Sequence, residues 1–186
     1  MRFVAVAVVT TALALGWLHP SGPPAPLIRL ADHTVAIDPP ADPGDGSLAG
    51  VDTLTPFDVQ NPAIGRLDPG LLSAVQNAAT AAASDGVTMT ITSGWRSPEF
   101  QQRLLDDAVH TYGSFAAARQ YVETPQMSKH VIGEAVDVGG AGADQWLIAN
   151  GSRFGLCQIY ANELWHFELA TDPLGNCPPL VPNAAS

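Results

Sequence analysis

The segment SKHVIGEAVD, residues 128–137, decides how this chain is built and what its centre can hold. Its end opens a short apolar run at residues 135–138, which glycines bound on both sides, and such a run is typical of a buried strand. A carboxylate within a buried strand is costly unless it is paired or bound to a cation. Asp137 is therefore predicted to have a cationic partner.

A second segment, ELWH at residues 163–166, supplies the other half of a metal site. His130, Asp137 and His166 would give one zinc ion three protein ligands and leave its fourth position to water, whose pKa the metal lowers to about 7. Glu163 would be the general base that takes the proton of that water. Residues three apart in a regular strand point to opposite faces. We therefore expect a turn, a bulge or a strand start at residues 164–165.

The spacing of these residues is weak support when taken alone, because an isolated histidine or aspartate is usually a surface residue or a satisfied hydrogen-bonding group. The strand-like surroundings of Asp137 are what favour a metal site. Glu168 would share a strand face with His166, although such a residue is ordinarily an edge carboxylate. The residues by themselves indicate metal-assisted hydrolysis and do not name a substrate.

These two segments also resemble a known family. The pattern Ser-x-His-x-x-Gly-x-Ala-x-Asp, followed by Glu-x-Trp-His, is similar to the zinc D-alanyl-D-alanine carboxypeptidases of bacterial cell walls, the VanY-like members of the LAS peptidase group. The upstream segment SGWRS, residues 93–97, and Gln101 extend the resemblance, which covers most of residues 68–169. Leu164 stands where the family commonly has Pro, and Trp95 where it has Tyr.

The resemblance implies an enzyme with one Zn²⁺ per domain that removes the terminal D-Ala from peptidoglycan stem peptides. It implies that Arg96 is catalytic and holds the developing oxyanion, and that Gln101, Ser128 and Trp165 bind the substrate. Two alternatives stay open. One is an L,D- or endo-acting peptidase of the same group, and the other is a non-catalytic zinc-containing module that binds the wall. Glu163 argues against the second, because pure binding needs no base beside the metal.

Helices and strands alternate along the second half of the chain, which predicts an α+β domain with a small, mainly antiparallel sheet and flanking helices. The resemblance implies the same fold, the LAS or hedgehog-like DD-peptidase fold. Asp68 and Ser97 are each followed by Pro, a pattern typical of helix N-termini. The expected helices are residues 69–84, 98–112, 114–122 and 143–153, and the expected strands are residues 87–92, 135–138, 156–160 and 164–169.

Three regions are predicted along the 186 residues. Residues 1–25 combine a basic start with a short apolar run and are interpreted as a signal peptide or an N-terminal anchor. Residues 26–66 are rich in Pro and Gly and are interpreted as a linker or arm. Residues 67–186 are interpreted as the zinc peptidase domain. The protein is thus expected to be exported to the periplasm, the cell wall or the extracellular space.

The formal net charge is −10, from 18 acidic and 8 basic residues. Such a balance argues against nucleic acid and against an anionic membrane surface as partners. The expected partners are peptidoglycan stem peptides, with no protein partner required and with membrane contact only through an uncleaved N-terminal anchor.

Cys157 and Cys177 are the only cysteines of the chain. In an exported protein they are expected to form one disulfide, which would enclose Glu163 and His166 in a loop. A cysteine metal ligand is the competing interpretation. It is disfavoured because the proposed ligand set is complete without either cysteine.

Overall fold

The computed structural model describes residues 44–48, 50–51 and 53–186, all of which belong to the compact unit Ile37–Ser186. The predicted signal peptide or anchor at residues 1–25 and the first part of the predicted arm lie outside the described residues. Within the described part of the chain, no helix is long and apolar enough to cross a membrane.

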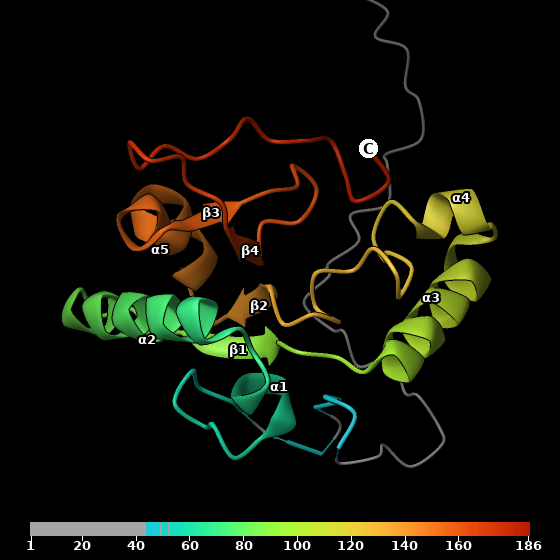
Figure 1. The fold of residues 1–186 in the computed structure, drawn as a ribbon, viewed down its shortest axis with the longest axis horizontal. Helices are drawn as coiled ribbons and strands as arrows, with labels where there is room; N and C mark the ends of the chain where they lie inside the picture. Colours follow the sequence, from blue (N-terminus) through green and yellow to red (C-terminus); the bar gives the residue numbers. More distant parts are fainter. Residues whose placement is uncertain (1–43, 49, 52) are drawn as a thin grey trace, which may run out of the picture. The chain divides into compact units, whose positions relative to one another are not determined.

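Four antiparallel strands form one sheet in the order β1-β2-β4-β3 (Figure 1). The predicted small antiparallel sheet is therefore confirmed. The strands are β1 Thr90–Ser93, β2 Ala135–Gly139, β3 Leu156–Gln158 and β4 His166–Leu169. β2 is buried along nearly its whole length and lies between β1 and β4, so any group on it is shielded from water.

Helices flank this sheet. They are α1 Pro62–Gly65, α2 Pro69–Ser84, α3 Pro98–Tyr112, α4 Phe115–Ala118 and α5 Ala143–Asn150, with the 3₁₀ turn η1 Gly151–Phe154 after α5. Figure 1 shows α2 and α5 on one side of the sheet and α3 with α4 on the other. The main core joins α2 and α5 to the sheet, whereas Leu105, Ala108 and Ala118 form a separate, smaller cluster between α3 and α4.

Both predicted helix N-caps are present. The Asp68 side chain accepts hydrogen bonds from the backbone N–H groups of Gly70 and Leu71, at 2.8 and 3.1 Å. The Ser97 side chain accepts from the N–H of Phe100 at 3.0 Å. These bonds satisfy donors that the first helical turn leaves unpaired, which is why α2 and α3 begin at the predicted residues.

Several helices and strands are shorter than predicted. The helix expected at 114–122 ends as α4 at Ala118, and the helix expected at 143–153 changes to η1 at Gly151. Packing explains why residue 151 is a glycine, because a Cβ there would lie 2.7 Å from the carbonyl oxygen of Leu156. The strand expected at 164–169 begins only at His166, which leaves room for a turn before it.

The packed part of the chain begins upstream of Leu67. Leu54 bridges to Ile91 of β1, whose N–H donates to the Leu54 carbonyl at 2.8 Å. Ala63 and Ile64 of α1 are fully buried in the main core. The backbone N–H of Trp95 donates to the Ala63 carbonyl at 2.8 Å, so α1 also holds the chain that follows β1. Residues that a Pro-rich composition placed in an arm thus form one edge of the domain.

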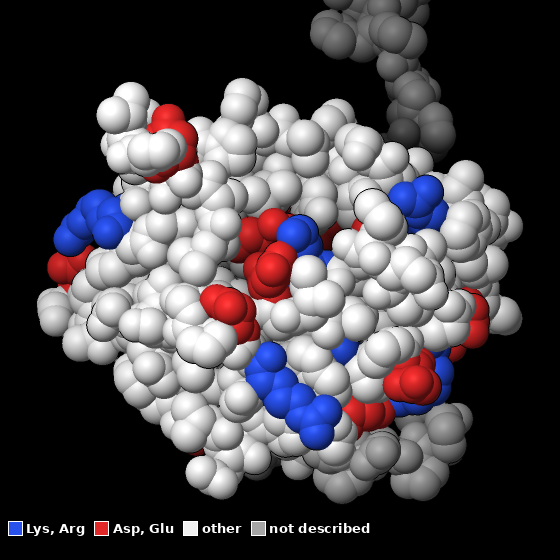
Figure 2. Space-filling model, in the orientation of Figure 1, with Lys and Arg blue, Asp and Glu red and all other residues white. Residues whose placement is uncertain are grey.

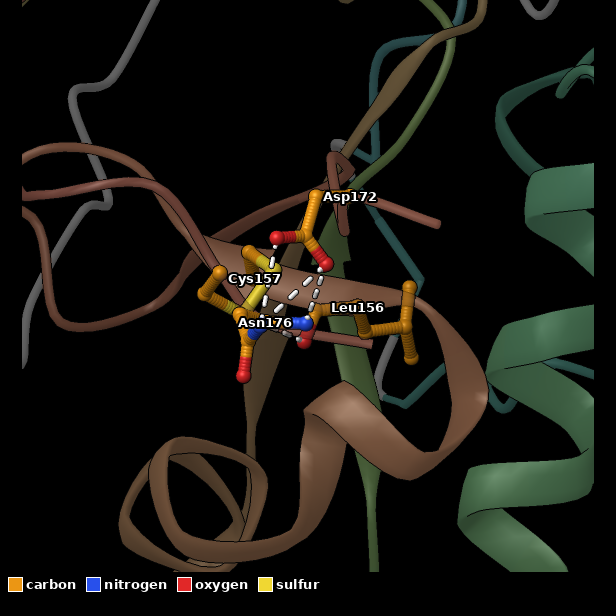
Figure 3. Close-up of a disulfide and its surroundings, with 5 residues drawn as sticks. Leu156, Cys157, Asp172 and Asn176 are labelled. Carbon is orange, nitrogen blue, oxygen red and sulfur yellow. Dashed lines mark hydrogen bonds between the residues drawn. A yellow bond between two sulfur atoms is a disulfide. The ribbon is translucent and has the colours of Figure 1, made fainter. Parts of the chain in front are cut away.

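The C-terminal segment is covalently tied to the sheet. Cys157 of β3 and Cys177 form a disulfide with an S–S distance of 1.97 Å, as predicted (Figure 3). Among the described residues no cysteine is free, which excludes a cysteine ligand in the described structure. The disulfide is typical of an oxidising compartment.

Replacing Ile64 by Ala should lower the free energy of unfolding by about 2–5 kcal/mol, because it empties a fully buried site. Chemical denaturation of the purified protein would measure the loss. Phe57→Ala is the matched control upstream of Leu67, since Phe57 is 55% exposed and its truncation should change stability little. Equal, negligible effects of both changes would show that α1 is only an arm.

Candidate metal centre

The candidate ligands come from three places that the sheet brings together. Asp137 of β2 and His166 of β4 are register partners in the antiparallel ladder. His130 lies in the turn that leads into β2. All three side chains are buried, and each offers one ligand atom to the same point.

The separations of these atoms fit a metal ion. His130 Nε2 lies 3.3 Å from His166 Nδ1 and 3.4 Å from Asp137 Oδ1, and His166 Nδ1 lies 3.2 Å from Asp137 Oδ1. A tetrahedral zinc ion with bonds of about 2.0 Å has ligand-to-ligand separations of about 3.3 Å. The three atoms therefore form one face of a tetrahedron of the size that zinc requires. The predicted ligand set is brought together.

Each histidine is oriented through its other ring nitrogen. His130 Nδ1 donates a hydrogen bond of 2.8 Å to the Gly94 carbonyl, and His166 Nε2 donates one of 3.0 Å to Glu168 Oε1. In the neutral ring such a bond fixes the tautomer and leaves the opposite nitrogen with a lone pair for a metal. Glu168 is thus a supporting carboxylate, which the alternation of strand faces had suggested and which the expected site residues did not include.

Asp137 is held by its second oxygen. Arg96 Nη2 donates to Asp137 Oδ2 at 2.8 Å, which leaves Oδ1 on the side of the two histidines. Burial would raise the pKa of Asp137, but the two histidines and the Arg96 guanidinium outweigh burial and hold that pKa well below its usual range. The carboxylate is therefore ionised, as a metal ligand must be.

The two histidines differ in their electrostatic surroundings. Burial and the nearby Arg96 charge lower the pKa of His130, so this ring is neutral. Burial also opposes charge on His166, but its contacts with Asp137 and Glu168 prevail and raise its pKa to about 9. The carboxylates around His166 thus create a site that favours a positive charge.

Glu163 lies beside this group on the turn that precedes β4. The His166 N–H donates to the Glu163 carbonyl at 3.3 Å, which closes the turn expected at residues 164–165. The Glu163 side chain is 6% exposed, and its Oε1 has no hydrogen-bond partner within the described chain. Burial raises the pKa of Glu163 to about 7. A buried carboxyl group near neutrality, with an unused oxygen, has the properties of a general base.

Arg96 is part of a network that starts at the ligand Asp137. Besides that bond, its Nε donates to Ser93 Oγ at 2.7 Å and its Nη1 donates to Gln101 Oε1 at 3.0 Å. Gln101 is 1% exposed, and its Nε2 donates to the Glu123 carbonyl at 2.8 Å. Both ends of the Gln101 amide are therefore engaged. Each end keeps one further donor or acceptor position, so the role of Gln101 in substrate binding stays a prediction.

The remaining predicted residues lie around the same group. Ser128 is buried two residues before His130. The Trp165 carbonyl accepts from the Val138 N–H at 2.9 Å, which joins the turn to β2. The roles of both in substrate binding stay predictions. In Figure 2, acidic side chains gather around a hollow at the centre of the face, where β2 and β4 lie in Figure 1.

The fold and the site together define a class, the zinc metallopeptidases, because a His-Asp-His ligand group stands beside a buried glutamate whose Oε1 has no partner within the described chain. The family model described as VanY, D-alanyl-D-alanine carboxypeptidase, matches residues 65–171, more than half of the chain. The chain belongs to this VanY family.

Known proteins agree with this assignment. A D-alanyl-D-alanine carboxypeptidase of Enterococcus faecalis is 31% identical over 127 residues, which cover 55% of this chain and 47% of that protein. The chain thus matches about half the length of this relative. Residues 172–186, including Cys177, lie outside the part of the chain that the family model matches.

Solved structures show the same fold. A variant of the vancomycin resistance D,D-pentapeptidase VanY in complex with Zn(II) has a TM-score of 0.52 at 31% identity, covering 55% of this chain and 71% of that chain. VanYB in complex with D-alanine-D-alanine has a TM-score of 0.52 at 29% identity, covering 55% and 70%. The D,D-dipeptidase VanXYg, at 24% identity and a TM-score of 0.55 over 66% and 57%, shares the fold.

Replacing Glu168 by Gln should weaken zinc binding by about 10- to 100-fold, because the His166 ring loses a charged acceptor that orients it. Competition with a chromophoric chelator would measure the affinity. Glu134→Gln is the matched control, since Glu134 pairs with Lys129 on the surface and bonds neither histidine in the described structure.

The ligand variants His130→Ala, Asp137→Ala and His166→Ala should each lose zinc, and unchanged occupancy in all three would refute the ligand assignment.

Proposed function

We propose that this chain is a zinc-dependent D,D-carboxypeptidase that removes the terminal D-Ala from peptidoglycan stem peptides. The observation that carries the proposal is the convergence of three ligand atoms at tetrahedral spacing beside the unpartnered Oε1 of Glu163. The substrate class is supported by membership of the VanY family and by the D-alanine-D-alanine complex of VanYB.

Zinc, when bound by His130, Asp137 and His166, would supply a Lewis acid for the scissile carbonyl and a water of lowered pKa. Glu163 accepts the proton of the attacking water and passes it to the amine of the leaving D-Ala. Its burial suits this exchange, because a carboxyl group with a pKa near 7 can both take up and release a proton at neutral pH.

In this proposal Arg96 holds the ligand Asp137 and also binds the developing oxyanion. A guanidinium carries five N–H groups, and three of them donate to Ser93, Gln101 and Asp137. Two N–H groups remain for the developing oxyanion or a neighbouring carbonyl of the substrate. Gln101 keeps the guanidinium in place, and Ser128 offers a hydroxyl group to the peptide.

The same proposal includes export. The Cys157–Cys177 disulfide fits an oxidising compartment, and the basic and apolar start of the sequence fits a signal peptide or anchor. The enzyme would then meet its substrate in the periplasm, in the cell wall or outside the cell. A pure binding module is disfavoured, because it would gain nothing from a buried Glu163 whose Oε1 has no partner within the described chain.

Glu163→Gln should keep zinc and lose at least about 100-fold in turnover, because the amide has nearly the same shape but cannot accept the proton. Metal analysis and steady-state rates on a synthetic pentapeptide stem would measure the two effects separately. Glu99→Gln, an exposed carboxyl group in the first turn of α3, should be close to the wild type. Full turnover in the Glu163 variant would demote this residue to a structural role.

The bond that is cut can be read from the products. We expect release of one D-Ala from a pentapeptide stem and a large loss of rate when the C-terminus is amidated, because a carboxypeptidase recognises a free terminal carboxylate. Mass spectrometry of the products from pentapeptide, tetrapeptide and cross-linked stems would measure this. Release of a D-Ala-D-Ala dipeptide, or equal cleavage of the amidated stem, contradicts the carboxypeptidase assignment and leaves the metallopeptidase class intact.

A further inference from the structure

We propose that residues 172–186, the C-terminal brace, are a positioning element that holds the general base Glu163 in place. This inference rests on the proposed function, since it concerns the base of that reaction. The brace lies outside the part of the chain that the VanY family model matches, so the family match does not account for it.

The brace is fixed to the sheet at its first half. The carboxylate of Asp172 accepts hydrogen bonds from the N–H groups of Leu174 and Asn176, at 2.8 and 2.9 Å, and these bonds close a turn. The turn directs the chain to Cys177, whose disulfide to Cys157 joins it to β3 (Figure 3). The disulfide therefore fixes the start of the brace beside β3.

The second half of the brace pairs with the chain that leads to the site. Val181 forms a parallel bridge with Tyr160. The Val181 N–H donates to the Ile159 carbonyl at 3.0 Å, and the Ala161 N–H donates to the Val181 carbonyl at 2.8 Å. The connection between β3 and β4 is thus held by two backbone hydrogen bonds at the residues immediately before the turn that carries Glu163.

The held segment touches the site directly. The Tyr160 ring lies 5.0 Å from the His166 ring, centroid to centroid, and the Glu163 N–H donates to the Tyr160 carbonyl at 3.3 Å. Asn162 of the same segment also donates, from its Nδ2, to the Gln120 carbonyl at 2.7 Å. The segment before Glu163 is therefore bonded both to the brace and to the chain that follows α4.

This support matters because Glu163 has little of its own. Its Oε1 has no hydrogen-bond partner within the described chain, so no bond to that oxygen holds the carboxylate, and its position depends on the backbone that carries it and on the packing around the buried side chain. Proton transfer needs the base within about 2.6–3.2 Å of the atom it serves. The three zinc ligands are carried by β2, β4 and the turn before β2, whose backbones are not the bonding partners of Val181. Loss of the brace should thus impair turnover and spare zinc binding.

The test is Val181→Pro, compared with Val181→Ala in the zinc-loaded full-length protein. Proline removes the N–H that donates to Ile159, whereas alanine keeps it. We expect Val181→Pro to lower kcat on the pentapeptide stem about tenfold or more, with KM within about twofold and zinc occupancy unchanged. Val181→Ala should stay within about twofold of the wild type on both constants.

A background of Glu163→Gln separates positioning of the base from general loosening. If the brace acts through Glu163, Val181→Pro should cause no further loss of residual turnover there, because effects on one functional unit are not additive. An equal loss in both backgrounds, an unchanged kcat, or a loss of zinc in parallel with activity would each overturn the inference. Should Val181→Pro not fold, the pair Cys157→Ser with Cys177→Ser releases the same segment and is judged by the same criteria.

The brace can also be examined without any substrate. Amide hydrogen exchange at Ala161 should be faster in Val181→Pro than in Val181→Ala, because losing the bond from the residue-181 N–H to the Ile159 carbonyl loosens the pairing in which Ala161 donates to the residue-181 carbonyl. Faster exchange in a protein that releases no D-Ala would support the pairing of the brace with residues 159–161 and refute the proposed function. Unchanged exchange, together with normal release of D-Ala, would refute the brace alone.

Discussion

The structure depends on one pairing, that of Asp137 in β2 with His166 in β4. A shift of this register by one residue would turn the side chains of one strand to the opposite face and separate the two ligands. The pairing also places a carboxylate in the middle of a buried strand, which is stable only with partners. Arg96 takes one oxygen of that carboxylate and the two histidines face the other.

The features that could be predicted from the sequence are those that local rules determine. Asp68 and Ser97 cap helices because each stands before Pro and has a short polar side chain. The turn at 164–165 follows from the need to place Glu163 and His166 on one side. The ligand set itself is carried by two short segments, whose chemistry and family resemblance agree.

The features that were missed depend on contacts between distant segments. Pro62 and its neighbours have the composition of a linker, yet Ile64 is fully buried and belongs to the main core. The bonds of Gln101 to Arg96 and to the Glu123 carbonyl show only in three dimensions, and its predicted contact with the substrate stays a prediction. The pairing of Val181 with Tyr160 is a bridge between isolated residues, for which no sequence pattern exists.

The brace and one departure from the family pattern have a common physical basis. Leu164 stands where the family commonly has Pro, a residue that fixes φ and stiffens the chain. In this chain Leu164 is exposed, so its own packing contributes little to the turn. The restraint proposed for this turn rests instead on bonds around it, which are that from the His166 backbone N–H to the Glu163 carbonyl and the pairing of Ile159 and Ala161 with Val181. A covalently anchored C-terminal segment can thus provide from outside the restraint that a proline provides from within.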